Sequence, residues 1–226
     1  MSDTLKVCGL TIERGTKLRT YLPVPDTNVK IPLTIINGDQ DGPTLLITAG
    51  IHGGEYPGIA AAMELGRDIE PEHVAGCLIM MHPVNIQGFW ARREMIVPED
   101  GKNLNRVFPG DPMGTLADKT AYLISNNFFS IADFYVDMHS GDIHESLHPY
   151  VYYPGQPTPE VERNPVPWHA YSIWNIWYVR LQPAVPITTP PAPDFLLSLS
   201  NAAVPVSACT RISKPTRMIS AISCAS

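Results

Sequence analysis

Four absences in this sequence of 226 residues exclude several classes of protein. Its four cysteines, at positions 8, 77, 209 and 224, form no Cys-x-x-Cys pair, which argues against a disulfide framework or a zinc ribbon and fits a reducing cytoplasm. No apolar run approaches the length of a membrane span, and the N-terminus lacks a charged segment followed by an apolar one, so we expect no signal peptide. A formal charge of −6 gives no positive excess that would attract nucleic acid or an anionic membrane.

The end of the chain has no glycine and almost no acidic residues. All 16 glycines lie at or before Gly155, and Asp194 is the only acidic residue after Glu162. Prolines interrupt this stretch repeatedly, most densely over residues 183–193, which argues against helices and central strands there. Three of the four tryptophans also fall in it: Trp168, Trp174 and Trp177. Since tryptophan is atypical of solvated disorder, a simple Pro-rich linker explains the stretch poorly.

We predict a slip of the reading frame near residues 160–164, which would account for this change of composition. When the last base of each codon is read with the first two bases of the next, the codons of residues 183–197 allow GGAYNYAASAGFPS. The codons of residues 199–206 allow LERGGTG. The written residues largely set two of the three bases of each shifted codon, so this glycine-rich text is constrained. We therefore divide the chain into a catalytic α/β part, residues 1–160, and an aberrant Pro-rich tail, residues 161–226, which we expect to be frameshifted and poorly ordered.

The remaining pattern predicts one α/β domain. A hydrophobic content of 44% and this length are enough for a real core. Helical spacing predicts helices over residues 56–69 and 115–131, the second with Thr115 as N-cap. Apolar runs predict strands near residues 5–12, 17–22, 30–37, 43–50, 77–83, 133–138 and 149–153. Strands that alternate with helices indicate a layered α/β fold.

Two short segments, GIHGGE at residues 50–55 and DMHS at residues 137–140, contain candidate metal ligands. His52 and Glu55 follow one predicted strand, and His139 ends another. Glycines between the first two ligands let the chain turn sharply, and sites in open α/β sheets gather at the carboxyl ends of strands. Two imidazoles and one carboxylate suit a catalytic zinc ion whose fourth position stays open to water. A lone histidine after a strand is more often a packing or surface residue, so the prediction of one Zn²⁺ depends on all three ligands together.

A third segment, GKNLNRVFPG at residues 101–110, contains a candidate carboxylate site. The planar guanidinium of Arg106 can hold a carboxylate with two parallel hydrogen bonds, and Asn105 can add an amide donor. Alone, this pattern is more typical of a solvated loop.

Taken in order, GIHGGEYPG, DGKNLNRVFPG and DMHSGD resemble the succinylglutamate desuccinylase/aspartoacylase family, which is similar to the zinc carboxypeptidases in fold and metal site. The resemblance covers about residues 30–155. It implies an α/β fold with a mixed sheet flanked by helices, zinc carboxypeptidase-like and incomplete at the C-terminus in this chain. It also implies hydrolysis of an N-acyl amide to a free amine and a carboxylate.

Position by position, the resemblance implies that His52, Glu55 and His139 bind zinc. It implies that Asn105 and Arg106 hold the carboxylate of the substrate. Partners follow from this: we expect a small N-acyl amino acid, neither nucleic acid nor membrane, and leave open a homo-oligomer.

The family also has an arginine that stabilises the oxyanion, upstream of the Asn-Arg pair, and Arg92 and Arg93 are both candidates. Asp137 corresponds to a carboxylate that orients a ligating histidine. The general base of the family, a glutamate in its second half, is not present in the chain as written. It returns only in the Glu-Arg-Gly text of the shifted frame.

Residues 144–148 read HESLH, a formal match to the H-E-x-x-H signature of helical zinc proteases. Pro149 follows directly and disfavours helical geometry at His148, so we expect a loop near the mouth of the site. Two other interpretations stay open: a zinc carboxypeptidase that acts on peptides, and a catalytically inactive remnant.

Overall fold

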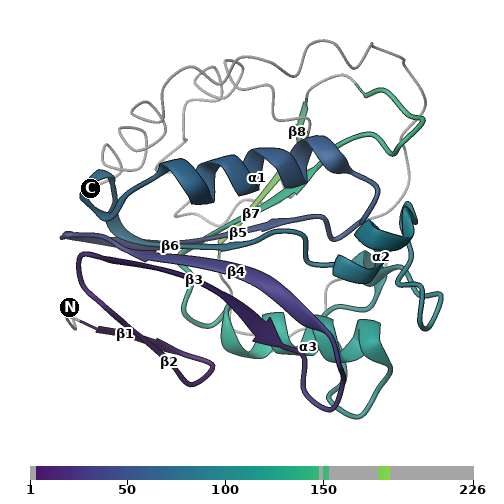
Figure 1. Cartoon of the computed structure of the whole chain (residues 1–226), viewed down its shortest axis with the longest axis horizontal. Coiled ribbons are helices and arrows are strands. Elements are labelled where there is room, and N and C mark those ends of the chain that lie inside the picture. The colour runs from purple at the N-terminus through teal and green to yellow at the C-terminus, as the bar shows by residue number, and fades with distance from the viewer. Residues whose placement is uncertain (1–3, 148–149, 153–177, 184–226) are drawn as a thin grey trace.

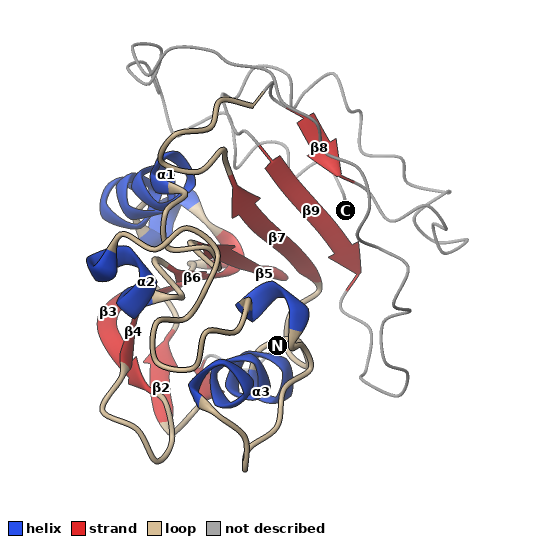
Figure 2. Ribbon diagram, turned by 90° about the vertical axis from the view of Figure 1, so that its right-hand side faces the viewer, coloured by secondary structure: helices blue, strands red, loops and turns tan. Residues whose placement is uncertain are grey.

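Seven strands form one mixed sheet in the order β3-β4-β6-β5-β7-β9-β8 (Figure 1; β9 is labelled in Figure 2). The computed structural model describes residues 4–147, 150–152 and 178–183. Strand β5 lies near the middle and runs parallel to β6 and to β7, while β3, β4 and β6 pair in antiparallel fashion. The strands are β3 (Thr16–Pro23), β4 (Lys30–Asn37), β5 (Gln40–Ala49), β6 (Ala75–Met81), β7 (Phe134–His139), β8 (Tyr150–Tyr152) and β9 (Tyr178–Pro183). This mixed sheet confirms the predicted α/β class.

Helices cover both faces of the sheet. Helix α1 (Tyr56–Asp68) lies on one face and α3 (Leu116–Asn127) on the other, as Figure 1 shows. Alternate residues of β6 face the two layers: Leu78 packs in the core cluster with α1, and Ile79 in the cluster with α3. A strand buried on both faces needs apolar residues at every position, which is why these strands read as continuous apolar runs.

Both predicted helices are present. Thr115 is the N-cap of α3, as predicted, and its backbone N–H donates to the Asp118 carboxylate at 2.9 Å. The helix ends at Asn127, and residues 128–131 continue as turns. Shorter helical elements were not predicted: α2 (Ile86–Ala91) and the 3₁₀ turns η1 (Pro71–His73) and η2 (Leu104–Arg106).

The single strand predicted near residues 5–12 is wrong. The segment forms a two-stranded hairpin of β1 (Thr4–Val7) and β2 (Leu10–Glu13), separate from the main sheet. The turn between them places Cys8 and Gly9 at φ values of 48° and 75°. Two consecutive residues with positive φ are what a tight hairpin turn requires.

The predicted tail, residues 161–226, contains one described element, the strand β9, which pairs antiparallel with β7 and parallel with β8. The rest of the tail lies outside the described residues, so the division at residue 160 stays a prediction. Among the described residues, no helix combines the length and apolar character that crossing a membrane requires.

Candidate metal centre

Three predicted ligands meet at the carboxyl ends of two adjacent parallel strands. His52 and Glu55 lie in the loop that joins β5 to α1, and His139 is the last residue of β7. Strands β5 and β7 pair in register up to Ala49 and Met138. Residues 84 positions apart in sequence therefore become neighbours at one edge of the sheet, and all three side chains are buried.

Glycines shape this loop: Gly53 and Gly54 form a turn, as predicted, in which the backbone N–H of Glu55 donates to the carbonyl of His52 at 3.3 Å. Gly50 takes the left-handed conformation, with φ of 69°. Gly53 is required for space instead: a Cβ there would lie 2.3 Å from the backbone nitrogen of Phe89 and 2.4 Å from the carbonyl carbon of Gly88. The loop therefore packs directly on the backbone of α2, which fixes the position of His52.

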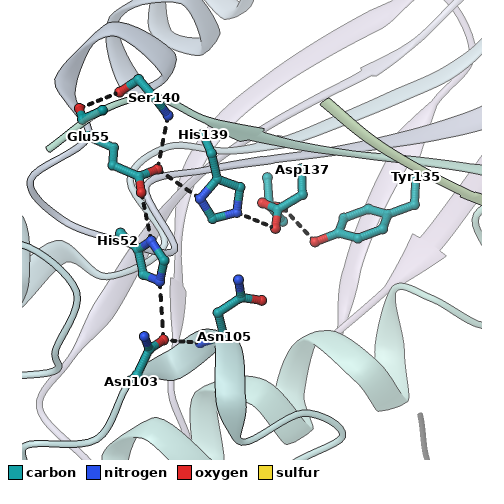
Figure 3. A network of polar contacts seen from close by, with 10 residues as sticks. His52, Glu55, Asn103, Asn105, Tyr135, Asp137, His139 and Ser140 are labelled. Carbon is teal, nitrogen blue, oxygen red and sulfur yellow. Dashed lines mark hydrogen bonds and ion pairs between the residues drawn. The ribbon is translucent and has the colours of Figure 1, made fainter. Parts of the chain in front are cut away.

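The Glu55 carboxylate lies between the two imidazoles (Figure 3). Its Oε1 is 2.7 Å from His52 Nδ1, and its Oε2 is 2.8 Å from His139 Nδ1. The backbone N–H of Ser140 also donates to Oε2 at 3.1 Å. One donor atom from each of the three side chains lies within 4.8 Å of the others, which is close enough for all three to bind one metal ion.

The Nε2 atoms of the two imidazoles have hydrogen-bond partners that leave Nδ1 for a metal. His139 Nε2 donates to Asp137 Oδ2 at 2.8 Å, and His52 Nε2 is 3.1 Å from Asn103 Oδ1. Asp137 and Asn103 each present an oxygen acceptor that holds the proton on Nε2. Each Nδ1, which faces the third candidate ligand Glu55, is therefore the nitrogen that can offer a lone pair to a metal. Ligating histidines in metal sites are usually oriented in this way. The residues therefore fit a divalent metal of the zinc type.

The charged groups of this cluster shift the pKa values of one another. Burial alone would raise the pKa of Glu55, but hydrogen bonds from His139 and His52 outweigh it and lower the pKa to about 2. Burial would lower the pKa of His139, but the Asp137 and Glu55 carboxylates raise it to about 10. A metal that binds Nδ1 of His139 must therefore displace a proton, so metal affinity depends on pH.

Asp137 is held from two sides. While Oδ2 accepts from His139, Oδ1 accepts a hydrogen bond from Thr48 Oγ1 at 2.7 Å. Thr48 Oγ1 also lies 2.8 Å from the Tyr135 hydroxyl. The sequence analysis did not single out Thr48 or Tyr135, because a threonine and a tyrosine inside apolar strands read as ordinary strand residues.

The turn that carries the two predicted carboxylate-binding residues lies beside the metal ligand His52. Asn105 and Arg106 belong to η2, and Figure 3 shows Asn105 projecting from this turn toward the two histidines. Arg106 is exposed, and its backbone N–H donates to the carbonyl of Asn103 at 2.9 Å. Asn103 itself was not singled out by sequence, although its side chain reaches His52.

The two candidate oxyanion arginines are both exposed, just after α2. Arg92 ends that helix with φ of 52° and lines an apolar pocket of about 630 Å³ with Phe89, Trp90 and Ile143. The Arg93 backbone N–H donates to the carbonyl of Gly88 at 2.9 Å. The choice between these arginines stays open.

A further carboxyl group, Asp142, lies near the cluster. Burial and the neighbouring charges of Glu55 and Glu94 raise the pKa of Asp142 to about 6. Its Oδ1 is buried without a hydrogen-bond partner among the described residues. In the H-E-x-x-H segment, His144 lies in a turn and Glu145 in a loop. The described part of that segment is therefore not the helix that the protease signature needs, and His148 lies outside the described residues.

A mixed α/β sheet with a buried His-Glu-His group at the ends of its parallel strands is an arrangement that can hold a metal ion. Residues 41–171 match the family described as Succinylglutamate desuccinylase/Aspartoacylase catalytic domain, and the chain belongs to this family.

Similar proteins extend this result. The chain is 40% identical over 128 residues to N-alpha-acetyl-L-2,4-diaminobutyric acid deacetylase of Halomonas elongata. The matched stretch covers 54% of this chain and 37% of that protein. A succinylglutamate desuccinylase/aspartoacylase structure from Rhodobacter sphaeroides is 28% identical with a TM-score of 0.59, over 74% of this chain and 57% of that one. The product-bound ectoine utilization protein EutE (DoeB) of Ruegeria pomeroyi is 27% identical with a TM-score of 0.61, over 74% and 59%. The chain thus spans only part of the length of the relatives it matches.

Proposed function

We propose that this chain carries the metal-binding part of a zinc-dependent hydrolase that cleaves the amide bond of an N-acyl amino acid. The observation that supports this most directly is the buried His52-Glu55-His139 group, whose donor atoms lie within 4.8 Å of one another. Membership of the desuccinylase/aspartoacylase family supports the deacylase reaction. The Halomonas relative suggests N-acetyl-2,4-diaminobutyrate as a first substrate to test.

The residues of the chain have separate tasks in this proposal. His52, Glu55 and His139 would hold the metal, which would act as a Lewis acid toward the acyl carbonyl and a water molecule. Asp137 orients His139. Asn105 and Arg106 bind the substrate carboxylate, since an arginine fork and an amide match its planar oxygens. Arg92 or Arg93 stabilises the negative charge that develops on the carbonyl oxygen.

The general base is the part that the written sequence does not supply. Such a base takes a proton from the attacking water and passes it to the leaving amine, typically contributing 10²- to 10⁴-fold in rate. We therefore expect the chain as written to bind zinc with little or no hydrolysis, and the chain read in the shifted frame to hydrolyse the amide.

The test begins with metal binding by the purified full chain. Zinc should bind in one-to-one ratio, and Glu55→Gln should weaken it because the substitution removes the only carboxylate ligand. The matched control is His144→Gln, an exposed residue of the H-E-x-x-H segment, which should leave zinc affinity unchanged. Loss of zinc in the His144 variant, with retention in the Glu55 variant, would move the site to the protease-like segment and contradict the proposal.

Hydrolysis is then measured with the shifted-frame protein on N-acetyl-2,4-diaminobutyrate and on a dipeptide. Cleavage of the N-acetyl amino acid alone supports the deacylase. Cleavage of the dipeptide alone favours a carboxypeptidase, and zinc binding without any turnover favours an inactive remnant.

A further inference from the structure

Asn103 connects the metal ligand His52 to the turn that carries the carboxylate-binding residues Asn105 and Arg106. Its side-chain oxygen Oδ1 lies 3.1 Å from His52 Nε2 and accepts the backbone N–H of Asn105 at 2.9 Å (Figure 3). Its backbone is held as well: the residue pairs with Ile96 in an antiparallel bridge, and its carbonyl accepts the backbone N–H of Arg106 at 2.9 Å. One residue therefore contacts a metal ligand and both members of the Asn-Arg pair.

These contacts determine which nitrogen of His52 faces a metal. A backbone N–H can only donate, so the Asn103 atom that faces Asn105 must be the amide oxygen, an acceptor. The same atom faces His52 Nε2, which must therefore donate and carry the proton. His52 is then left with Nδ1 for a metal, the nitrogen that lies 2.7 Å from Glu55 Oε1.

The two imidazoles are oriented by different chemistry. Asp137 presents a carboxylate to His139, and the charge raises the pKa of that histidine. Asn103 presents a neutral amide to His52, which orients the ring without adding a negative charge to a cluster that already contains Glu55 and Asp137.

We propose that Asn103 is a positioning residue of the metal centre. It fixes His52 with its proton on Nε2 and, through the same oxygen, fixes the turn that carries Asn105 and Arg106. Asn103 thus fixes the position of His52 relative to the turn whose residues bind the substrate carboxylate. This inference rests on the proposed function, because it takes zinc as the ion at His52 and a substrate carboxylate as the ligand of Asn105 and Arg106.

The experiment compares zinc dissociation constants of full-length variants by competition with a chromophoric chelator. Asn103→Leu has similar size but no acceptor, and it should weaken zinc binding roughly 10- to 100-fold, as is typical when the hydrogen-bond partner of a ligating histidine is removed. Asn103→Asp keeps the acceptor and should stay within a few-fold of the unaltered chain. The matched control is Asn127→Leu, which removes a 2.9 Å side-chain hydrogen bond to Leu123 at another half-buried asparagine and should leave zinc affinity unchanged.

A role limited to capping the η2 turn would not change the protonation of His52. Long-range ¹H–¹⁵N spectra of the zinc-loaded protein therefore provide the second measurement, with the proton expected on Nε2 in the unaltered chain and in Asn103→Asp. If Asn103→Leu does not fold, Asn103→Ala provides the same comparison.

Wild-type zinc affinity in a folded Leu or Ala variant, or a proton on Nδ1 of His52 in the unaltered chain, would overturn the inference about Asn103 alone. Absence of zinc binding by the unaltered chain would overturn both this inference and the proposed function. Zinc binding without hydrolysis in the shifted-frame protein would contradict only the hydrolase.

Discussion

Asp137 and His139 lie two residues apart on β7, and the Asp137 carboxylate accepts the His139 Nε2–H at 2.8 Å. Side chains at positions i and i+2 of a strand point to the same face of the sheet, so the sequence Asp-x-His at a strand end places a carboxylate beside a ligand without any help from a distant loop. Figure 2 shows β7 between β5 and β9 in the sheet. The relationship is therefore local in sequence and supported by the strand itself.

Asp137→Asn tests this relationship. The variant keeps the volume of the side chain but removes the charge that holds His139, and we expect zinc affinity to fall roughly 10- to 100-fold. Zinc titration by calorimetry provides the measurement. Asp133→Asn is the matched control, because Asp133 accepts the backbone N–H of Thr44 at 2.7 Å in an exposed position away from the ligands. An equal loss of affinity in both variants would count against a specific role for Asp137.

Thr48→Val tests the hydrogen bonds behind Asp137. Valine has the shape of threonine without the hydroxyl that donates to Asp137 Oδ1 and contacts the Tyr135 hydroxyl. The change removes the donor to the buried Asp137 Oδ1, and the loss of a hydrogen bond to a buried polar atom typically costs about 1–3 kcal/mol, so the free energy of unfolding in urea should fall by about that amount. Tyr135→Phe and the double variant complete a mutant cycle. A coupling above about 0.5 kcal/mol is expected for residues that share a network, and strict additivity would show that the two hydroxyls act independently.

The sequence was sufficient where the information is local. The spacing of His52 and Glu55, the apolar runs of β5 and β7, and Thr115 with Asp118 at the start of α3 all depend on nearby residues, and the structure brings each of them to its expected place. The contact between Asn103 and His52 joins residues 51 positions apart. It depends on the path of the loop after α2, which no periodicity encodes.

The hairpin of β1 and β2 was missed for a related reason. Its turn places Cys8 in the left-handed region, and cysteine is not one of the residues that mark such turns. Apolar residues on both sides of the turn then read as one longer strand.

Gly53→Ala tests how closely the metal loop packs on α2. The added Cβ would lie 2.3 Å from the Phe89 nitrogen and 2.4 Å from the Gly88 carbonyl carbon. These are backbone atoms that cannot rotate away, so the loop or the helix must shift, and both thermal stability and zinc affinity should fall. Gly101→Ala is the control, because a Cβ there meets no heavy atom within 4 Å and adds only the strain of its φ of 69°. A smaller drop in melting temperature for Gly53→Ala than for Gly101→Ala would contradict this packing.

His82 provides a prediction on pH. Burial lowers the pKa of His82 below its ordinary value of 6.5, and the nearby charge of Arg19 acts in the same direction. The unfolded chain therefore binds this proton more readily than the folded chain, so stability should fall as the pH falls below about 6.5. His82→Gln can still bond the Thr34 hydroxyl, which lies 3.1 Å from His82 Nε2, but it does not titrate. Urea unfolding should show a smaller loss of stability between about pH 7.5 and pH 5.5 in this variant, and an equal loss in both proteins would exclude His82 as the cause.

The reading frame after residue 160 is the remaining prediction. The sequence has no glycine after Gly155 and only Asp194 as an acid after Glu162, and within this changed stretch the shifted codons of residues 183–206 allow family-like text. A single-base slip would cause this abrupt change, whereas selection for a Pro-rich linker would give no reason for a glycine-rich alternative frame. Resequencing of the coding DNA from codon 150 to beyond codon 226 should show one base gained or lost, and peptides of the native protein should contain glycine beyond residue 164. If the written frame stands instead, residues 163–226 are genuine, and the chain should bind zinc with little or no hydrolytic activity.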